Sequence, residues 1–188
     1  PDVLFLDEPV SALDPAGPWN RLTIVLAYAT EAYLFIPDLN QSPFNVGTRL
    51  TLGDFSAEEL ADLVSRYGSP LRTANEVELL AQIVGGHPFL SRMALQAIAI
   101  GRVGLDGLVL EAERDDGLFS EHLDRMFVSL TQDARLTELV RRILRGTAAE
   151  DSEGLARLRG AGVLLPDQSG GPRMRCGLYR AYLARRLA

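Results

Sequence analysis

Two kinds of hydrophobic pattern divide the chain. Near its start, the runs Val3–Leu6 and Thr23–Thr30 are almost continuously apolar, as in strands that are buried on both faces of a parallel sheet. A third, shorter strand is expected at 49–52. From residue 55 onward, apolar residues recur every three or four positions, which is the spacing of amphipathic helices. The pattern predicts an α/β fold class, with a partial parallel sheet followed by helical domains.

Four helices are predicted between residues 55 and 118. Ser56 and Glu59 have the spacing of a capping box at the start of the first helix, which ends near Gly68. The run Gly85-Gly86-His87-Pro88 stops the second helix and starts the third. The three later helices are predicted over Asn75–Val84, Phe89–Ile100 and Leu105–Arg114. We expect these helices to form a small bundle, a lid, on the end of the sheet.

Another pattern begins at Phe119. Helices are predicted over 120–130, 136–145, 151–159 and 178–187. Between the last two, short strands are predicted at 163–166 and 173–176. Three helices followed by a hairpin is the order of a winged helix. We therefore predict three domains, which are a partial parallel-sheet core at 1–54, the helical lid at 55–118 and a winged helix at 119–188.

Composition excludes several protein classes. With 47% hydrophobic and 23% charged residues among 188, the chain is globular and not disordered. No apolar run approaches the ~18 residues of a membrane span, and the single cysteine, Cys176, rules out internal disulfides. We therefore expect a cytoplasmic protein with no membrane partner. Because Pro1 directly precedes a core strand, we also expect that the beginning of the protein is missing.

Charge is distributed unevenly along the chain. The net charge is -6, but residues 1–118 hold 7 Arg against 17 acids, whereas residues 119–188 hold 12 Arg against 8 acids. The basic C-terminal part is expected to pack on the acidic part or on a partner protein. Nucleic acid is the less favoured partner.

Two acids follow the first apolar run directly. Asp7 and Glu8 at the end of a buried strand are typical of a Walker B element, in which Asp7 would bind Mg²⁺ and Glu8 would orient a water for attack on a γ-phosphate. Thr30 ends the next strand, so it could lie on the same rim of the sheet. However, the chain has no G-x-x-x-x-G-K-[ST] loop and no lysine, so the phosphate-binding loop is missing. Residues 1–54 are therefore predicted to be a partial P-loop ATPase core. An ordinary core strand with a polar end is the alternative.

Two family resemblances meet in the sequence. The first ten-residue match, Leu6-Asp7-Glu8-Pro9-x-Ser11-Ala12-Leu13-Asp14-Pro15, resembles the Walker B and D-loop of ABC-type ATPases, although no switch histidine follows the next strand. The second covers almost the whole chain from Trp19 onward and resembles the bacterial AAA-like domain family, P-loop ATPases related to the signal-transduction (STAND) NTPases. Its motifs are Trp19-x-Arg21-Leu22, Ala29-Thr30-Glu31-x-Tyr33, the loop 40–47, Gly85-Gly86-His87-Pro88-Phe89-Leu90, Glu121-His122-Leu123 and Leu178-Tyr179-Arg180-x-Tyr182.

The second resemblance implies a set of roles. ATP and Mg²⁺ would be cofactors of the intact protein, with Asp7 as the magnesium ligand, Glu8 as the catalytic acid and Thr30 as a sensor of the γ-phosphate. Gly86-His87-Pro88 would be the G-x-P element of the lid, whose proline packs against the nucleotide base. The winged helix would couple the nucleotide state to a regulatory partner protein or a fused effector domain. Where that family has a longer helical stretch before the tryptophan, only residues 9–18 separate Glu8 from Trp19 here.

Simpler interpretations stand beside these roles. Thr30 could cap a strand end, and Pro88 could be a plain first-turn proline. His122 is expected to be an exposed helix residue, and Cys176 is expected to serve packing. Arginines that could contact phosphates are Arg141, Arg142, Arg145, Arg157 and Arg159. Without lysine or a P-loop, the chain itself is not expected to hydrolyse ATP. The alternative function is a nucleotide-independent protein-interaction or DNA-binding module.

Overall fold

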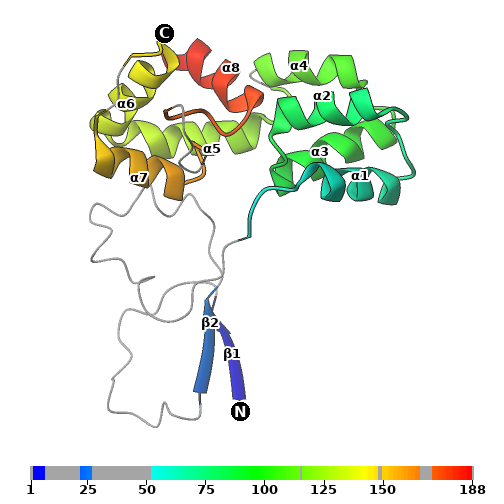
Figure 1. Cartoon of the computed structure of the whole chain (residues 1–188), viewed down its shortest axis with the longest axis horizontal. Coiled ribbons are helices and arrows are strands. Elements are labelled where there is room, and N and C mark those ends of the chain that lie inside the picture. Colours follow the sequence, from blue (N-terminus) through cyan, green and yellow to red (C-terminus); the bar gives the residue numbers. More distant parts are fainter. Residues whose placement is uncertain are drawn as a thin grey trace.

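The computed structural model describes residues 2–6, 22–26, 52–114, 116–147, 150–165 and 171–187. Two short strands and eight helices lie in these residues (Figure 1). The strands are β1 (Asp2–Leu6) and β2 (Leu22–Leu26). The helices are α1 (Ala57–Arg66), α2 (Ala74–Val84), α3 (Pro88–Ala99), α4 (Leu105–Glu113), α5 (Ser120–Thr131), α6 (Ala134–Leu144), α7 (Ser152–Gly160) and α8 (Gly177–Leu187). None of the described helices is long and apolar enough to span a membrane.

The predicted α/β fold class is wrong. The described core is built from helices alone, and β1 and β2 pair only with each other, Asp2 opposite Leu22 and Leu6 opposite Leu26. A parallel sheet of a P-loop protein is covered by helices on both faces, whereas the helices described here pack on one another and leave the two strands apart (Figure 1). The short strand predicted at 49–52 is not formed at Leu52, and its other residues lie outside those described.

Helices α1 to α4 form the lid unit. The predicted capping box of α1 is confirmed, because the Ser56 backbone N–H donates to Glu59 at 2.8 Å and the Glu59 N–H donates to the Ser56 hydroxyl at 3.2 Å. A second capping box, which the sequence reasoning missed, starts α2 with Thr73 and Glu76. Gly85 ends α2 in the left-handed conformation, with φ +67°, which glycine adopts without steric cost. Local sequence therefore sets the helix ends.

Helices α5 to α8 form the C-terminal unit, in which α6 contacts α5, α7 and α8. Between α7 and α8, Leu164 and Met174 form one antiparallel bridge. It is flanked by hydrogen bonds from the Leu165 N–H to the Arg173 carbonyl and from the Arg175 N–H to the Val163 carbonyl, both at 3.0 Å. The predicted strands are thus reduced to a single bridge within the described residues, and residues 166–170 between them lie outside those residues.

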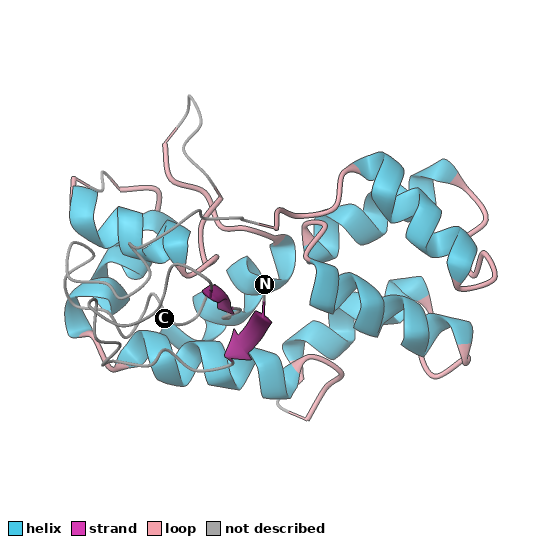
Figure 2. Ribbon diagram, turned by 90° about the horizontal axis from the view of Figure 1, so that it is seen from below, coloured by secondary structure: helices cyan, strands magenta, loops and turns pink. Residues whose placement is uncertain are grey.

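A continuous core joins the lid unit to the C-terminal unit. Helix α8 packs on α2 and α4 of the lid unit as well as on α5 and α6 of its own unit, and Figure 2 shows the two groups of helices side by side. Leu80 and Val84 of α2 and Leu183 of α8 are all completely buried in this core. The apolar stripe of α8 therefore holds the two units together.

Candidate functional site

The turn between α2 and α3, Gly85-Gly86-His87-Pro88, is named here the lid turn. Its two glycines have φ of +67° and +71°, and neither position has room for a side chain. A Cβ atom on Gly86 would lie 2.4 Å from the Phe55 carbonyl oxygen, and one on Gly85 would lie 2.6 Å from the Arg175 carbonyl oxygen. Pro88 is the first residue of α3, where its fixed φ suits the helix. The lid turn is therefore pressed between two other segments of backbone.

One of those segments is residues 52–56, named here the entry segment because it leads into α1. The Phe55 N–H donates to the Gly86 carbonyl at 2.8 Å. Asp54 accepts hydrogen bonds from Arg175, whose Nε lies 3.0 and 3.1 Å from the two carboxylate oxygens and whose Nη2 also donates to Oδ1. The ion pair joins residues that are 121 positions apart in sequence. It links the entry segment to the start of α8.

A cluster of four rings lies against the lid turn. His87 meets His122 of α5 edge to face, with 5.4 Å between ring centroids, and lies 6.3 Å from the ring of Tyr179. His122 and the Tyr179 hydroxyl share a hydrogen bond of 2.7 Å, and their rings stack at 23°. Phe89, which is 38% exposed, lies 5.3 Å from the His122 ring. The cluster brings one side of α3 against both α5 and α8.

His87 is the chemically unusual member of this cluster. Its Nδ1 is buried and has no hydrogen-bond partner among the described residues. Burial is the largest cause that lowers the pKa of His87, and with the charges of Arg175 and His122, and against the opposing effect of Asp54, it brings this pKa to about 3. The imidazole is therefore neutral at physiological pH. In addition, α3 has no side-chain hydrogen bond at its N-cap.

Two further buried groups lie near the lid turn, namely Cys176 beside Gly85 and Ser91 in α3. Cys176 is buried, and that burial raises the pKa of its thiol to about 11. Its sulfur accepts a hydrogen bond from the Tyr179 N–H at 3.5 Å. A protonated buried thiol is a poor nucleophile, so the predicted packing role of Cys176 is confirmed. The Ser91 hydroxyl, one turn along α3 from His87, is completely buried.

The structure brings together only part of the predicted site. The lid turn, which contains Gly86, His87 and Pro88, lies against the backbone of Phe55 and Arg175. The charges of Arg175 and Asp54 act on His87, and the sequence reasoning selected neither of these two residues as site residues. The residues predicted for magnesium and γ-phosphate, namely Asp7, Glu8 and Thr30, lie outside the described residues, so their roles stay predictions. Among the residues that the structure describes, no group of three or more His, Cys, Asp or Glu side chains could hold a metal ion.

The predicted exposure of His122 is wrong, because its side chain is buried with 8% exposure. A helical position is inward or outward depending on which neighbour covers it, and α8, which covers His122, is distant in sequence. The sequence motif that begins with Leu178-Tyr179 contains the partner of His122, because the Tyr179 hydroxyl shares a hydrogen bond with the His122 ring. The sequence alone does not show that the two motifs touch.

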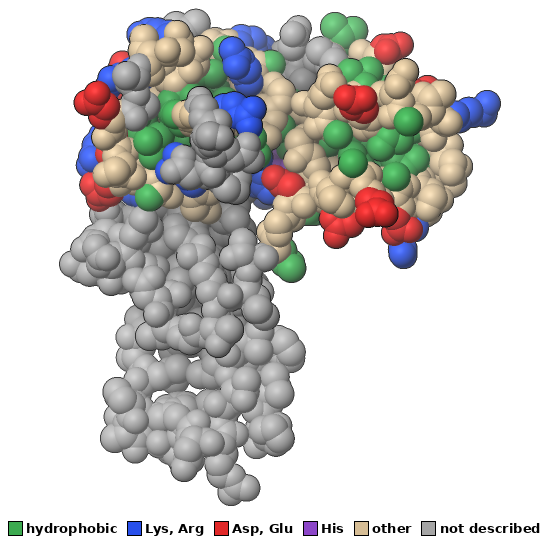
Figure 3. Space-filling model, in the orientation of Figure 1, with side chains coloured by type: hydrophobic (Ala, Val, Ile, Leu, Met, Phe, Trp, Pro, Cys, Tyr) green, Lys and Arg blue, Asp and Glu red, His purple; other side chains and the backbone are tan. Residues whose placement is uncertain are grey.

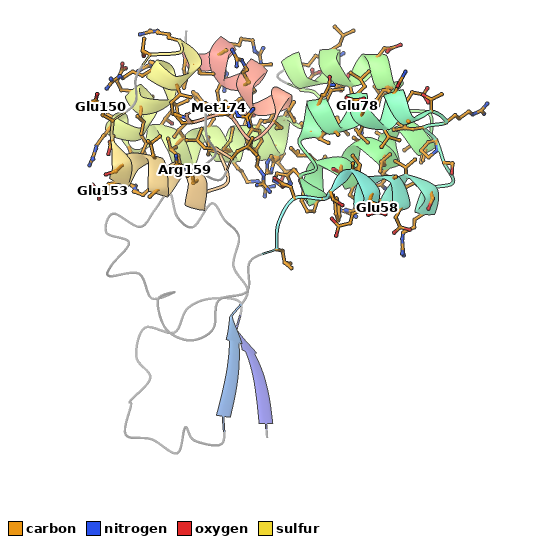
Figure 4. All side chains as sticks on the ribbon, viewed as in Figure 1. Glu58, Glu78, Glu150, Glu153, Arg159 and Met174 are labelled. Atoms are coloured by element: carbon orange, nitrogen blue, oxygen red, sulfur yellow. The ribbon has the colours of Figure 1, made fainter. Side chains whose placement is uncertain are left out.

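The arginines divide into buried and exposed groups. Arg157 is only 7% exposed and donates to Asp133 at 2.6 Å, and Arg141 donates from Nε to the Leu187 carbonyl at 3.1 Å. Burial raises the pKa of Asp133, but the hydrogen bond and charge of Arg157 and the N–H groups of Leu136 and Arg135 together outweigh it, so that this pKa is lowered. Arg157 thus joins α7 to the N-cap of α6, and Arg141 joins α6 to the end of α8. In Figure 4, by contrast, Glu58, Glu78, Glu150 and Glu153 lie on the outside of the two units.

A small cavity of about 250 Å³ lies away from the lid turn. It is lined by Arg102, Val103, Glu111, Arg114, Asp116 and Leu118. Arg114 donates to both carboxylate oxygens of Asp116, at 3.0 and 3.1 Å, so these opposite charges are already paired. The lid turn, with its unpaired imidazole nitrogen, is the better candidate for a ligand contact.

In the described part of the chain, helices α1 to α4 pack on helices α5 to α8, and a Gly-x-Pro turn joins α2 to α3 where the two groups meet. The chain matches the family model described as AAA-like domain over residues 13–185. Because this match covers most of its length, the chain belongs to the AAA-like domain family. No curated protein and no solved structure matches the chain. The predicted family is thus confirmed, whereas the relation to signal-transduction NTPases and the ABC-like stretch stay predictions.

Proposed function

We propose that this chain is the nucleotide-responsive part of an AAA-like regulatory ATPase, in which the lid turn contacts the nucleotide and the C-terminal unit passes the nucleotide state to a partner. The observation that carries the proposal is the position of His87. It stands on the G-x-P turn, where the entry segment, the lid unit and the C-terminal unit meet, and its buried Nδ1 has no partner among the described residues.

The chemistry of the lid turn supports a contact with one part of ATP, its base. A neutral imidazole nitrogen can accept or donate one hydrogen bond according to its tautomer, and a purine base carries both kinds of group on its edge. The Pro88 ring would pack on the face of the base. ATP would supply binding energy and a γ-phosphate whose loss changes the state of the module. Asp7 with Mg²⁺, Glu8 and Thr30 would act at that phosphate.

The C-terminal unit would provide the output. Its order of three helices, an antiparallel bridge and a final helix supports a winged-helix type of coupling unit. The partner would be a regulatory protein or a fused effector domain. Because α8 packs on the lid unit as well as on α5 and α6, a shift of the lid would move this helix. This route would let a nucleotide at the lid turn change the surface of the C-terminal unit.

The base contact can be tested on the chain with its two histidines. We expect the imidazole resonances of His87 to shift on titration with ATP or adenosine and not with inorganic phosphate, and we expect His87→Ala to weaken binding of the adenosine. His122→Gln serves as the control for general damage to the ring cluster. The same titration is repeated on a longer form of the protein that carries a P-loop. If neither ATP nor adenosine shifts the imidazole resonances of His87 in either form, the base contact is refuted.

Hydrolysis gives a separate test. The chain should not hydrolyse ATP above background, because no lysine is present to bind the phosphates. In a form that supplies a P-loop, Glu8→Gln should retain Mg-ATP binding and lose hydrolysis, since the amide keeps the size of the carboxylate but not its charge. Turnover of about 1 per second by the chain alone, lost in Glu8→Gln, would contradict the proposal.

DNA binding is the second candidate, and the charge of the C-terminal unit favours it. Arg180, Arg185 and Arg186 are exposed on α8, and Figure 3 shows basic side chains on this unit. However, the buried pairing of Arg157 removes one predicted phosphate contact. Duplex DNA titrated at two salt concentrations decides between the candidates. Sub-micromolar, strongly salt-dependent affinity that falls in Arg180→Ala and not in Arg66→Ala, on the lid, would favour DNA.

A further inference from the structure

The entry segment is the only covalent path between residues 1–51 and the helices. Its first two described residues make no tight contact: Leu52 is 93% exposed, and the space around Gly53 is open. The first anchored residue is Asp54, and Phe55 follows it with the hydrogen bond to Gly86. A movement that reaches the helices along the chain therefore arrives first at Asp54.

The partner of Asp54 is held on both sides. The Arg175 N–H donates to the Val163 carbonyl at 3.0 Å, and the Arg175 carbonyl lies against Gly85, where even a methyl group would not fit. Two residues later, a Cβ on Gly177 at the start of α8 would lie 2.9 Å from the Gln82 carbonyl oxygen. Because these backbone contacts leave no free space, Arg175 cannot shift without moving the lid turn and α8.

The Asp54–Arg175 ion pair is partly buried, so separating its two charges is unfavourable. The Arg175 side chain is 13% exposed and the Asp54 side chain 25% exposed. Burial opposes the charge of Arg175, but hydrogen bonding to Asp54 together with the charges of Asp54, Tyr179 and Cys176 outweighs it and raises the pKa of the guanidinium. Removing one member leaves the other partly buried without its counter-charge, which destabilises a protein far more than the loss of an exposed pair.

We propose that the Asp54–Arg175 ion pair is a latch that makes the entry segment, the lid turn and the start of α8 open and close together. In the closed state the latch keeps His87 against His122 and Tyr179. When the entry segment is displaced, the same event frees Arg175, the lid turn and α8. The proposed function enters this inference at one point, since it names the nucleotide as the cause that displaces the entry segment. The coupling between the three segments does not depend on the nucleotide.

Hydrogen exchange of the nucleotide-free chain tests the latch. The amides to follow are those of Phe55, bonded to Gly86, and Arg175, bonded to Val163. Asp54→Asn and Arg175→Met should each speed exchange at both amides by at least about tenfold, as expected when a partly buried charge loses its partner. The double variant should add little to either single one. The exposed pair Asp62–Arg66, at 59% and 71% exposure, is the matched control, and Asp62→Asn should leave both amides unchanged.

Separate effects would overturn the latch. If Asp54→Asn changed only the Phe55 amide and Arg175→Met changed only the Arg175 amide, the two segments would open independently. Should these variants fail to fold, the charge-reversed pair Asp54→Arg with Arg175→Asp decides, since it should restore joint protection if pairing couples the segments. Loss of nucleotide binding with intact coupling would refute the proposed function and leave the latch standing.

Discussion

The pKa of His87 predicts a specific acid sensitivity. The perturbation is a fall in pH from 7.5 to 5, and the stability of the natural chain is compared with that of His87→Gln. Glutamine keeps a polar side chain but does not titrate in this range. His87 is neutral in the folded chain, with a pKa of about 3 against 6.5 for an ordinary histidine. Below pH 6.5, His87 therefore binds a proton in the unfolded chain and stays neutral in the folded chain.

The sign and size follow from linkage. Above pH 6.5 both states hold a neutral His87, so the residue contributes nothing to the pH dependence. Between 6.5 and 3 the unfolded state binds more protons, and stability is lost as the pH falls. At pH 5 the difference from the unfolded pKa is 1.5 units, which corresponds to a loss of about 2 kcal/mol at about 1.4 kcal/mol per unit.

The assay is urea unfolding of both chains at pH 7.5, 6.5, 5.5 and 5.0. Other groups titrate in the same range, so the quantity to compare is the difference between the natural chain and His87→Gln at each pH. Between pH 7.5 and 5, the free energy of unfolding of the natural chain should fall by about 2 kcal/mol more than that of His87→Gln. Imidazole NMR of the folded chain, which has two histidines, should show no titration of His87 above pH 5. Parallel stability curves, or a His87 midpoint near pH 6.5, would refute the reasoning.

Two further substitutions test the packing of the seam and of the C-terminal unit. Gly86→Ala should destabilise the chain by about 1 to 3 kcal/mol more than Gly101→Ala. Both positions have positive φ, +71° and +72°, but only Gly86 lacks space for a methyl group. Equal losses of stability in urea unfolding would contradict this prediction. Asp133→Ala should cost about 2 to 4 kcal/mol, since it removes the N-cap of α6 and the partner of buried Arg157. Glu121→Ala, which breaks an exposed pair with Arg125, should cost under about 1 kcal/mol, and similar losses for the two variants would show that the Asp133 pair adds little.

Signals within a few residues predicted most of the helical part. The capping box of Ser56 and Glu59, the proline at the start of α3 and the aspartate before α7 act through their own backbone neighbours, so each helix was found within a few residues of its ends. The sheet was predicted wrongly because an apolar run does not show whether helices cover its two faces. The strands that formed pair only with each other.

By itself, the sequence determined the order and ends of the helices, the family and the absence of any P-loop lysine, since all of these depend on local residue identity. Only the tertiary structure decided that His122 is buried, that Arg157 is paired with Asp133 and that Asp54 meets Arg175 across 121 positions. Each depends on contacts between elements that are distant in sequence, namely α8 with α5, α7 with α6, and the segment before α8 with residues 52–56. Long-range packing selects one arrangement among many that a helical pattern allows, and at the lid turn it leaves a buried, neutral and unpaired imidazole.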